Sequence, residues 1–535
     1  MSSSDPVTFD HRWRRAVQLF PNAVFLVFKA DDDTVTQWTY AEFDEIVGRL
    51  AANLVTLGCT PGSSIHIALR NCPAFVGLWL AAARVGAWIV PVDPASSSRD
   101  IESQIRRTNP AVGFCAADRA DIYRRGAASV PHVLALAETA QDLELDGVLT
   151  SAIDWRVVEL EPAPSPTTRL AVMFTSGTTS EPKGVVLSQH NYAHVADTMS
   201  SIIDLTSRHR WLVTLPLFHA NAQYYCFAPA IAVGASVALT ARFSASQWPF
   251  WAQELNATHA SLFAAPIRMI LARRRPDAPA LELEHVWFAQ SLAPAHYAEF
   301  AELAGCVPRQ LYGMTETVAI VTAELGDNPR CDSIGRPADA GRTTAVVELE
   351  SDSPAPTGTP GMLLVAGVPG QDLFCEYLDD PATTAATLVD DGNTTWLRTS
   401  DLVSSDSEGG LRFVGRADDV IKVAGENVSL TEIEATIAQA PGVLEAAVLA
   451  RPDPIRDVVP IAFVVANSHT PRLSEAGLTE WAEKNLPPQS RPRAWHFVPE
   501  LPRTSVGKIR RHQLQASADS DIGHDRPITA SENKD

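Results

Sequence analysis

Short apolar segments alternate with longer amphipathic segments along most of the chain. An apolar run at residues 65–69 is followed by a helical pattern over residues 75–84 and by a second apolar run at 88–92. Short apolar runs of this kind are typical of buried strands, and their alternation with helices indicates βαβ units. The sequence therefore predicts an α/β fold in which helices cover the faces of parallel sheets.

A second, smaller domain is predicted toward the C-terminus. Its pattern contains one helix and two strands, at residues 430–440, 446–450 and 461–466. We expect a large N-terminal domain over residues 1–416 and a small, mobile α+β domain over residues 417–515. Residues 516–535 are polar and have little apolar surface to bury, which predicts a disordered tail.

Composition and charge exclude several classes of protein. The chain has 535 residues, of which 46% are hydrophobic and 20% are charged, as in an ordinary multidomain enzyme. Its net charge of −20 argues against binding to nucleic acid or to anionic membranes. No apolar run is long enough to cross a membrane, and no secretory signal opens the chain. The seven scattered cysteines indicate reduced thiols, so we expect a cytoplasmic protein.

A run rich in hydroxyl and glycine residues follows the apolar segment at residues 170–174. It reads Thr175-Ser176-Gly177-Thr178-Thr179-Ser180-Glu181-Pro182-Lys183-Gly184. Backbone N–H groups, hydroxyls and one lysine in a tight loop can hold a polyphosphate, although many such runs are plain surface loops. The buried strand before the run and its Pro-Lys-Gly ending favour phosphate binding. The run is not the common nucleotide P-loop, because Gly184 stands where that loop needs a Mg²⁺-binding hydroxyl.

Lysine is rare in this chain and is concentrated in motifs. Lys and Arg together number 43, yet only six are lysines, which suggests a high-GC bacterial genome. Three of the six, Lys183, Lys422 and Lys508, lie in the phosphate-binding run or in the motifs described next. A compact ammonium is difficult to replace by a planar guanidinium where negative charge is spread over several oxygens.

Four further motifs follow the phosphate-binding run. They are Tyr-Gly-Met-Thr-Glu at residues 312–316, Arg-Thr-Ser-Asp at 398–401, a Gly-Arg-Ala-Asp segment leading to Gly-Glu-Asn at 415–427, and a Gly-Lys-Ile segment at 501–511. Taken singly, they could be a helix start, a turn-closing Asp, a charged turn and a solvated basic patch. The five motifs together resemble, in order, those of the adenylate-forming enzymes, which include acyl-CoA synthetases, peptide-synthetase adenylation domains and luciferases. The details look most like the crotonobetaine/carnitine–CoA ligases and related acyl-CoA synthetases.

The resemblance implies a reaction in two steps. A carboxylic acid would react with ATP and Mg²⁺ to give acyl-AMP, and the acyl group would then pass to coenzyme A, so that the enzyme is an acid–thiol ligase. In this resemblance Lys508 reaches the carboxylate and the α-phosphate, Thr315 contacts the α-phosphate, and Glu316 holds Mg²⁺. His219 would belong to both the catalytic group and the acid pocket, and Asp418 would be the hinge of the small domain.

Nucleotide and CoA binding are assigned in the same way. Tyr312 would lie beside adenine, Asp401 would bind the ribose hydroxyls, and Gly425 would line the pantetheine tunnel. The full set implied for ATP and CoA is Thr175, Ser176, Gly177, Thr178, Thr179, Lys183, Tyr312, Gly313, Asp401, Arg416, Lys422 and Gly425.

The acid pocket is expected to be roomy and apolar. Its implied lining is His219, Ala222, Phe263, Ala264, Ser291 and Ile320, with further alanines nearby. Small side chains leave volume and large apolar ones keep it dry, which favours a bulky hydrophobic acid such as those of bacterial secondary metabolism. These alanines could equally pack the domain core.

Some positions depart from the family pattern. Ser180 and Ser400 each replace a usual glycine, and Ser291 and Leu292 add side chains near the expected adenine site. These departures predict weakened ATP binding and a slow adenylation step. The alternatives are a thioesterifying ligase that receives acyl-AMP from a partner adenylating enzyme, an enzyme that loads a carrier protein, a luciferase-type monooxygenase and a non-enzymatic nucleotide-binding protein. The sequence leaves a homodimer open.

Overall fold

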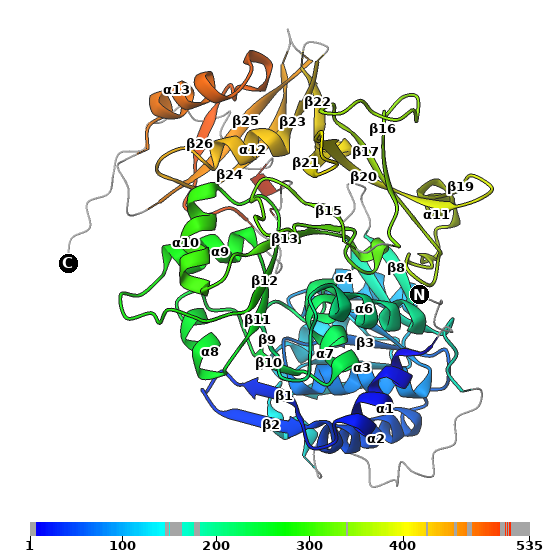
Figure 1. Cartoon of the computed structure of the whole chain (residues 1–535). Helices are drawn as coiled ribbons and strands as arrows, with labels where there is room; N and C mark the ends of the chain where they lie inside the picture. Colours follow the sequence, from blue (N-terminus) through cyan, green and yellow to red (C-terminus); the bar gives the residue numbers. More distant parts are fainter. Residues whose placement is uncertain are drawn as a thin grey trace. The chain divides into compact units, whose positions relative to one another are not determined.

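The structure is a computed structural model of the chain (Figure 1). It describes residues 7–144, 149, 163–175, 182–338, 341–423, 426–453, 457–467, 473–502, 509, 511, 513 and 514. The chain divides into two compact units, Met1–Phe413 and Val414–Asp535. No helix among the described residues is long and apolar enough to cross a membrane.

The largest sheet of the first unit has nine strands, in the order β15-β14-β13-β12-β11-β9-β10-β1-β2. Their bounds are β1 Val24–Lys29, β2 Val35–Thr39, β9 Arg210–Val213, β10 Ser236–Thr240, β11 His259–Phe263, β12 His285–Ala289, β13 Arg309–Tyr312, β14 Thr322–Ala323 and β15 Arg336–Pro337. The six strands from β13 to β1 are parallel to one another. Their carboxyl ends therefore share one edge of the sheet.

A second sheet has seven strands, in the order β18-β8-β7-β4-β3-β5-β6. Their bounds are β3 Ser64–Ala68, β4 Trp88–Pro91, β5 Val112–Ala116, β6 His132–Leu136, β7 Arg169–Thr175, β8 Lys183–Ser188 and β18 Glu376–Tyr377. The strands from β7 to β6 are parallel, whereas β8 and β18 run antiparallel to their neighbours. The strands predicted at residues 65–69 and 88–92 are β3 and β4, and the parallel α/β prediction is confirmed.

A third, antiparallel sheet lies at the end of the first unit, and its strand β21 continues past Phe413. It has the order β16-β17-β20-β19, and β21 pairs with β20. The bounds are β16 Thr344–Val347, β17 Gly361–Gly367, β19 Leu388–Asp390, β20 Thr395–Ser405 and β21 Leu411–Arg416.

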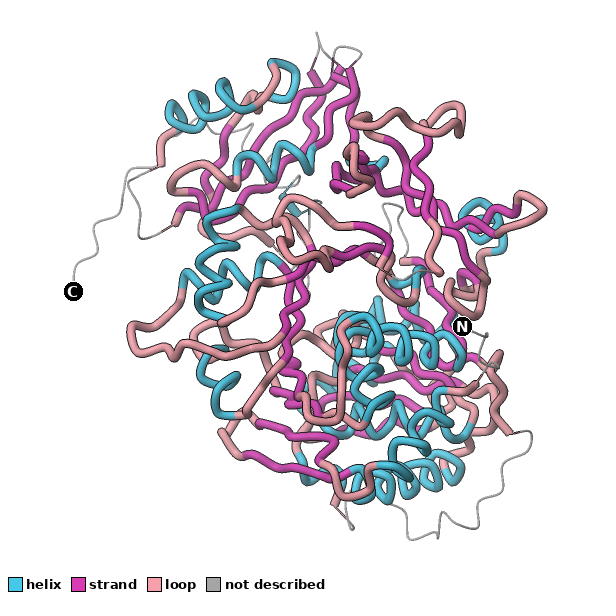
Figure 2. The backbone as a smooth tube through the Cα atoms, viewed as in Figure 1, coloured by secondary structure: helices cyan, strands magenta, loops and turns pink. Residues whose placement is uncertain are grey.

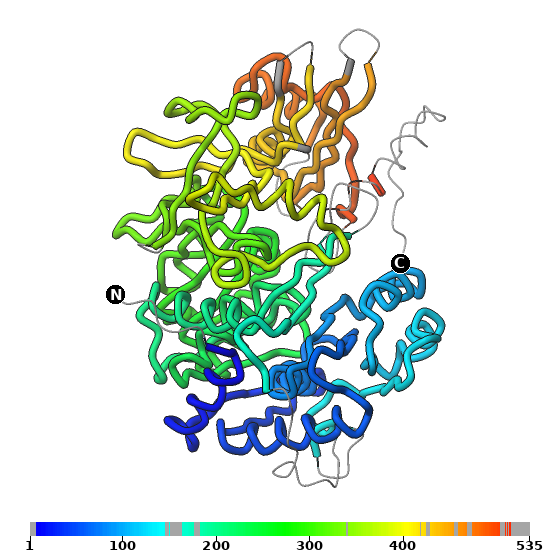
Figure 3. Tube along the Cα trace, turned by 90° about the vertical axis from the view of Figure 1, so that its right-hand side faces the viewer, coloured from blue at the N-terminus to red at the C-terminus, as the bar shows by residue number. Residues whose placement is uncertain are grey.

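Helices cover both faces of the two large sheets. They are α1 Phe9–Leu19, α2 Tyr40–Thr56, α3 Pro73–Val85, α4 Ser98–Thr108, α5 Ala120–Gly126, α6 Gln189–Ile202, α7 Ala228–Val233, α8 Trp248–Glu254, α9 Ala264–Ala272, α10 Pro294–Ala304 and α11 Pro381–Thr387, with the π-helical turn η4 Asn221–Phe227 and the short 3₁₀ turns η1 Ala117–Arg119, η2 Ala140–Leu143 and η5 Thr315–Thr317. In Figure 3, the segment from α2 to β6 forms one lobe, coloured blue to cyan.

Three apolar cores hold the described part of this arrangement, and two of them show how helices pack on the nine-stranded sheet and beyond. Helices α8, α9 and α10 lie along one side of the nine-stranded sheet (Figure 1), where Trp248 and Phe300 pack with Phe288 of β12. The larger core includes Trp79 of α3 and Trp211 of β9. Full burial of one such aromatic side chain contributes roughly 2–3 kcal/mol to folding.

Helix α3 shows how local sequence and packing agree. Every residue of its span is buried, and its sequence is apolar on all sides apart from Arg84, which is paired with Asp10 and Asp44. Pro73 is its first residue, where a missing N–H has no cost, and Gly86 ends it with φ +72°.

The second unit is a sheet in the order β23-β22-β25-β24 that carries two helices on one face, with β26 paired to β25 (Figure 2). Its elements are β22 Val420–Val423, β23 Glu426–Ser429, α12 Leu430–Ile437, β24 Val443–Asp453, β25 Asp457–Ala466, α13 Glu475–Asn485 and β26 Trp495–Phe497, with the turns η6 Ala417–Asp419 and η7 Pro488–Ser490. The helix predicted to reach residue 440 ends at Ile437, because Pro441 and Gly442 follow closely and Gly442 has φ +86°.

Candidate active site

The carboxyl edge of the nine-stranded sheet gathers four loops that carry predicted site residues. Strands β9, β11, β12 and β13 are neighbours, and Phe263, Ala289 and Tyr312 are the last residues of the latter three. The loop after β9 leads to His219, two residues before η4. Open α/β sheets bind their ligands at this edge, so the topology brings distant segments to one candidate site.

Tyr312 and Asp401 form a buried pair at this edge. The Tyr312 hydroxyl donates a hydrogen bond of 2.6 Å to Oδ2 of Asp401, across 89 residues of chain. Asp401 lies on β20, and the Tyr312 ring lies 6.4 Å from the ring of Phe413. The two residues that the resemblance assigns to adenine and to ribose are therefore in direct contact.

The phosphate-binding run connects β7 to β8. Thr175, the last residue of β7, is the register partner of Lys183, the first residue of β8. This antiparallel pairing fixes both ends of the run. Ser176, Gly177, Thr178 and Thr179 lie outside the described residues, so their assignment stays a prediction.

Glu316 and Lys183 are joined by a tyrosine that the sequence does not mark. The Tyr377 hydroxyl donates a hydrogen bond of 2.9 Å to Oε1 of the buried Glu316. The Lys183 ammonium lies 5.1 Å from the centre of the Tyr377 ring, over its face. Tyr377 belongs to β18, which pairs with β8 directly after the phosphate-binding run. One side chain thus contacts the predicted phosphate cation and the predicted metal carboxylate.

The backbone after Glu316 bends sharply. Thr315, Glu316 and Thr317 form the 3₁₀ turn η5, and the fully buried Val318 that follows has φ 66° and ψ −79°. A β-branched residue in this region is strained, and such strain persists where the surroundings impose it. Here the buried Arg342 donates a hydrogen bond of 2.9 Å to the Thr317 carbonyl. The sequence does not mark Val318 or Arg342, because their roles at this turn depend on the fold.

Gly313 is required by close packing. A Cβ atom at this position would lie 2.9 Å from the Tyr225 hydroxyl and 3.3 Å from Cα of Ile320. Burial also raises the pKa of Tyr225, so its hydroxyl stays neutral. Gly313 therefore lets the turn toward Glu316 pass against η4.

The residues expected to line the acid pocket are divided between two cores. Ala222 and Ile320 are buried in the larger core, and Ala264 is buried in the core under α8 to α10. Phe263 and His219 are half-buried, and the rings of Phe218 and His219 lie 4.5 Å apart. The pocket role of these residues stays a prediction.

Three of the four departures from the family pattern lie among the described residues, and Ser180 lies outside them. The expectation that Leu292 adds a side chain beside adenine is wrong, because Leu292 is 4% exposed and packs in the core under α8 to α10. Ser291 is exposed, and the preceding Gln290 takes φ +75°. Ser400 takes φ +60°, so serine keeps the left-handed backbone that the usual glycine would adopt.

The second unit carries the remaining predicted residues. Arg416 is half-buried, Asp418 belongs to η6, and Lys422 is exposed on β22. Gly425 and Lys508 lie outside the described residues. Arg511 donates hydrogen bonds of 2.8 and 3.0 Å to the two carboxylate oxygens of Glu434 on α12. Burial raises the pKa of Glu434, and the charge of Arg511 opposes this shift.

The donor set suits Mg²⁺ only in the presence of phosphate oxygens. Within the described part of the chain, no group of three or more His, Cys, Asp or Glu side chains could hold a metal ion. Mg²⁺ commonly binds through one or two carboxylates together with substrate phosphates. Glu316 fits the carboxylate role, because it is buried near Lys183 through Tyr377.

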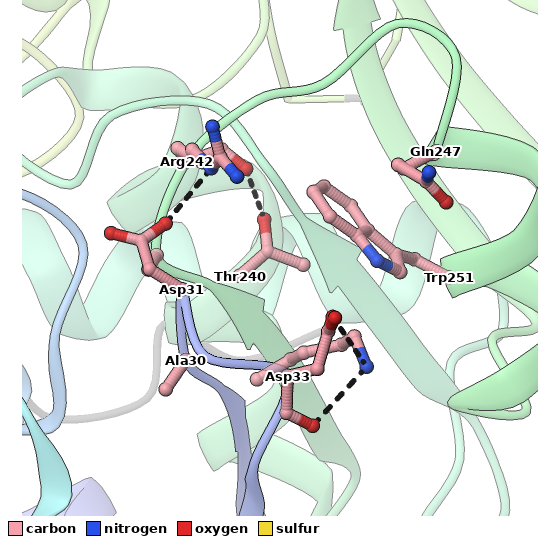
Figure 4. Close-up of a pocket in the computed structure, with 9 residues that line it drawn as sticks. Ala30, Asp31, Asp33, Thr240, Arg242, Gln247 and Trp251 are labelled. Carbon is pink, nitrogen blue, oxygen red and sulfur yellow. Dashed lines mark hydrogen bonds and ion pairs between the residues drawn. The ribbon is translucent and has the colours of Figure 1, made fainter.

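A small cavity of about 140 Å³ lies at the carboxyl ends of β1 and β10. Figure 4 shows Trp251 beside it and the ion pair between Arg242 and Asp31, whose Nε to Oδ1 distance is 2.9 Å. None of its lining residues is among the predicted site residues.

Comparisons with known proteins cover almost the whole chain. The model of the AMP-binding enzyme family matches residues 13–377, and that of the AMP-binding enzyme C-terminal domain matches residues 432–508. The crotonobetaine/carnitine–CoA ligase of Salmonella paratyphi A is 31% identical over 517 residues, which cover 94% of this chain and 98% of that protein. The ligase of the same name from Proteus mirabilis is 31% identical over 515 residues, with the same coverage of both proteins.

Solved structures share the fold. The anthranilate CoA ligase AuaEII in complex with anthranoyl-AMP has a TM-score of 0.84 at 21% identity, covering 98% of this chain and 99% of that one. The benzoate CoA ligase from Burkholderia xenovorans has a TM-score of 0.81 at 23% identity, covering 95% and 99%. The resemblance that the five motifs suggested is confirmed, and the chain belongs to the AMP-binding enzyme family.

Proposed function

We propose that this acid–thiol ligase is an acyl-CoA ligase that activates a bulky hydrophobic carboxylic acid. The acid carboxylate attacks the α-phosphate of ATP to give acyl-AMP and pyrophosphate, and the CoA thiol then displaces AMP. The contact of Tyr377 with both Glu316 and Lys183 carries this proposal, because it joins a cation for phosphate to a carboxylate for Mg²⁺. The CoA ligases that match over 94% of the chain support it.

The described residues suit binding and orientation of the nucleotide. Lys183 offers a positive charge at the end of the phosphate-binding run, and Thr315 offers a hydroxyl next to the predicted metal carboxylate. Tyr312 and Asp401, already joined, offer an aromatic face and a ribose acceptor. When bound, Mg²⁺ would neutralise part of the negative charge on the phosphates, and Glu316 would hold it.

The nature of the acid is inferred from the charges around the candidate site. Between residues 209 and 323, all of which are described, Glu316 is the one buried acidic residue. No second buried carboxylate is therefore present in this stretch to pair with an amino group on the substrate. The half-buried Phe263 and Ala289 at the carboxyl edge suit an apolar acid.

Two successive reactions at one acyl group need two arrangements of groups around it. Phosphate chemistry calls for a cation such as Lys508, whereas thiol attack calls for an open path past a residue such as Gly425. We infer that the small domain alternates between two poses about Asp418, which places each set at the acyl group in turn.

The alternative of a ligase with weak adenylation loses part of its support. It rested on four positions, which are Ser180, Ser291, Leu292 and Ser400. Leu292 packs in a core and Ser400 keeps the left-handed backbone that the usual glycine would adopt, whereas Ser291 is exposed and Ser180 lies outside the described residues. A comparison of acyl-CoA yield from acid plus ATP with the yield from synthetic acyl-AMP tests the point. If acyl-CoA formed only from synthetic acyl-AMP and not from acid plus ATP, this alternative would be restored.

The proposed function is tested with a panel of carboxylic acids. The panel should run from acetate and a betaine acid to long-chain, aromatic and polycyclic acids, with mass spectrometry of acyl-AMP and acyl-CoA. We expect CoA-dependent AMP release with the highest kcat/KM for bulky apolar acids. Release of AMP without any acyl-CoA would point to a carrier protein instead, and a preference for acetate or the betaine acid would contradict the proposed substrate class.

A further inference from the structure

Asn71 makes three buried hydrogen bonds to backbone groups of the nine-stranded sheet. It lies between β3 and α3 and is 4% exposed. Its Nδ2 donates to the carbonyls of Leu215 and Thr240, both at 3.1 Å, and its Oδ1 accepts from the Leu217 N–H at 2.8 Å. Both ends of the amide are therefore used on protein backbone.

These bonds tie the two large sheets together at their carboxyl ends. Asn71 follows β3 of the seven-stranded sheet, whereas Leu215 follows β9 and Thr240 ends β10 of the nine-stranded sheet. The candidate site is built on loops that leave this same edge. Asn71 thus acts where a small displacement would move the loop that leads to His219.

The peptide of Leu217 is also held from its other side. Nε2 of Gln223, on η4, donates a hydrogen bond of 2.6 Å to the Leu217 carbonyl. The Tyr192 hydroxyl, on α6, donates one of 2.6 Å to Oε1 of Gln223. Both side chains are fully buried, and α6 follows directly after β8, which begins with Lys183.

We propose that Asn71 is a positioning residue of the acid-activating step, which fixes the segment from Leu215 to Leu217 and through it His219. Leu217 is held by Asn71 on its N–H and by Gln223 on its carbonyl, and His219 lies two residues further on. Buried neutral hydrogen bonds with all partners satisfied favour one arrangement over its neighbours. The kinetic part of this proposal rests on the proposed function, because it requires His219 to act on the acid.

A matched control exists in the same unit. Gln189 is fully buried, and its amide also makes three bonds to backbone groups: Oε1 accepts from the N–H groups of Phe9 and Asp10, and Nε2 donates to the Ala83 carbonyl. These bonds join α6 to α1 and α3. Asn71→Leu and Gln189→Leu therefore remove equal numbers of buried hydrogen bonds from two different places.

The kinetic test compares these two variants at a temperature where both are folded. We expect Asn71→Leu to lower kcat/KM for the acid in AMP formation by 10- to 100-fold, while KM for CoA is unchanged. Gln189→Leu should lower the melting temperature but keep kcat/KM within about threefold of the parent enzyme. Equal losses in the two variants would overturn the proposal.

A double variant tests the route through His219. If Asn71 acts by placing His219, Asn71→Leu should cost little further activity in a His219→Ala background. Independent losses that multiply would contradict the proposal. Gln223→Met removes the hydrogen bond to the Leu217 carbonyl. If Asn71→Leu fails to fold, this variant should show the same loss of kcat/KM and the same lack of further loss in the His219→Ala background.

Hydrogen exchange gives a readout that needs no substrate. Amides of residues 212–219 should exchange faster in Asn71→Leu than in the parent chain, and should be unchanged in Gln189→Leu. Unchanged exchange in Asn71→Leu would refute the proposal that Asn71 fixes the segment from Leu215 to Leu217, whatever the activity of the variant. If the parent enzyme released no AMP with any acid, the proposed function would be refuted instead. The exchange result would then decide by itself whether Asn71 fixes the segment from Leu215 to Leu217.

Discussion

Two tyrosine hydroxyls define the candidate site at the scale of single residues. Tyr312 donates to Asp401 and Tyr377 donates to Glu316, and both carboxylates are buried. A neutral phenol orients a carboxylate without cancelling its negative charge. A buried arginine or lysine would orient the carboxylate and also cancel that charge. These hydrogen bonds therefore orient the two carboxylates that the resemblance assigns to Mg²⁺ and to ribose.

Tyr377→Phe is expected to weaken the use of Mg·ATP. The variant keeps the ring that faces Lys183 but removes the donor to Glu316, so kcat/KM for ATP should fall about tenfold, equivalent to ~1.4 kcal/mol. Adenylation measured at increasing Mg²⁺ should show a higher Mg²⁺ requirement. Tyr297→Phe removes a hydroxyl that donates to the Pro308 carbonyl at 2.7 Å, and should leave the Mg²⁺ dependence unchanged. Equal behaviour of the two variants would contradict the role of Tyr377.

Ser400→Gly is expected to stabilise the protein. Ser400 holds φ +60° on β20, which costs a residue with a Cβ atom about 1 kcal/mol relative to glycine. The melting temperature should therefore rise, with activity retained. Ser405→Gly is the matched control on the same strand, and it should lower the melting temperature because its backbone gains nothing from glycine. A fall in both variants would show that Ser400 is not strained.

At the scale of elements, the two edges of the nine-stranded sheet differ in chemistry. The carboxyl edge carries the candidate site, whereas the amino edge carries three buried histidines. His209 precedes β9, and His259 and His285 begin β11 and β12. Their ring centres are 4.6 Å apart for the first pair and 5.7 Å for the second. Closely packed imidazoles in a buried place are tolerated only while they are neutral.

Acid should destabilise the first unit through these histidines. Burial lowers the pKa of His259 to about 3 with a smaller contribution from the neighbouring His209, while Glu284 opposes the shift. Below pH 6.5 the unfolded chain binds a proton that the folded chain does not, so the free energy of unfolding falls as the pH drops toward 3. Between pH 7.5 and 5 this group alone should cost about 2 kcal/mol. Urea unfolding at both pH values measures the effect.

Variants isolate the contribution of His259. His259→Asn removes the titrating ring and should reduce the difference in unfolding free energy between pH 7.5 and 5. His11→Asn changes an exposed histidine of α1 and should keep the full difference. If the two variants behave alike, the acid sensitivity arises elsewhere.

The sequence predicts individual elements, but it does not predict the contacts between elements. Period and run length predict β3, β4 and α3 to within a few residues, because each element buries its own apolar face. Lys183 and Glu316 are predicted from separate motifs, but Tyr377 lies 61 residues from Glu316 and joins them only through the pairing of β18 with β8. Leu292 was misplaced because the direction of a loop side chain does not follow from its position in a motif.

At the scale of the whole molecule, the division into two units matters for the chemistry. The small unit has cores of its own, in which α12 and α13 cover one face of its sheet and Phe463 and Leu501 lie on the other. A unit with its own cores can move as a body without losing its fold. Within it, Arg511 joins Glu434 of α12 and lies 3.6 Å from Asp419 of η6. Arg511 thus lies close in the fold to η6, which contains the predicted hinge residue Asp418.

Gly425→Leu is expected to block the second half-reaction selectively. If Gly425 lines the path of the thiol, a leucine side chain would fill that path while ATP and the acid still react. Acyl-AMP should then accumulate, and acyl-CoA formation should fall by at least 100-fold. Unchanged turnover with CoA would show that Gly425 does not line the path. Gly442→Leu is no suitable control, because φ +86° at that position would add strain of its own.

Lys508→Ala should have the opposite effect, because its charge is needed only while negative charge develops on the α-phosphate. Acyl-AMP formation should fall by at least 100-fold, whereas thioester formation from supplied acyl-AMP should stay within a fewfold of the parent enzyme. Lys484→Ala removes an exposed lysine of α13 in the same unit, whose partner is Glu480 at 2.7 Å, and should leave both half-reactions unchanged. Rapid-quench assays of each half-reaction provide the measurement. Equal loss of both half-reactions in Lys508→Ala would mean that one pose serves both steps, and the alternation proposed for the small domain would then be wrong.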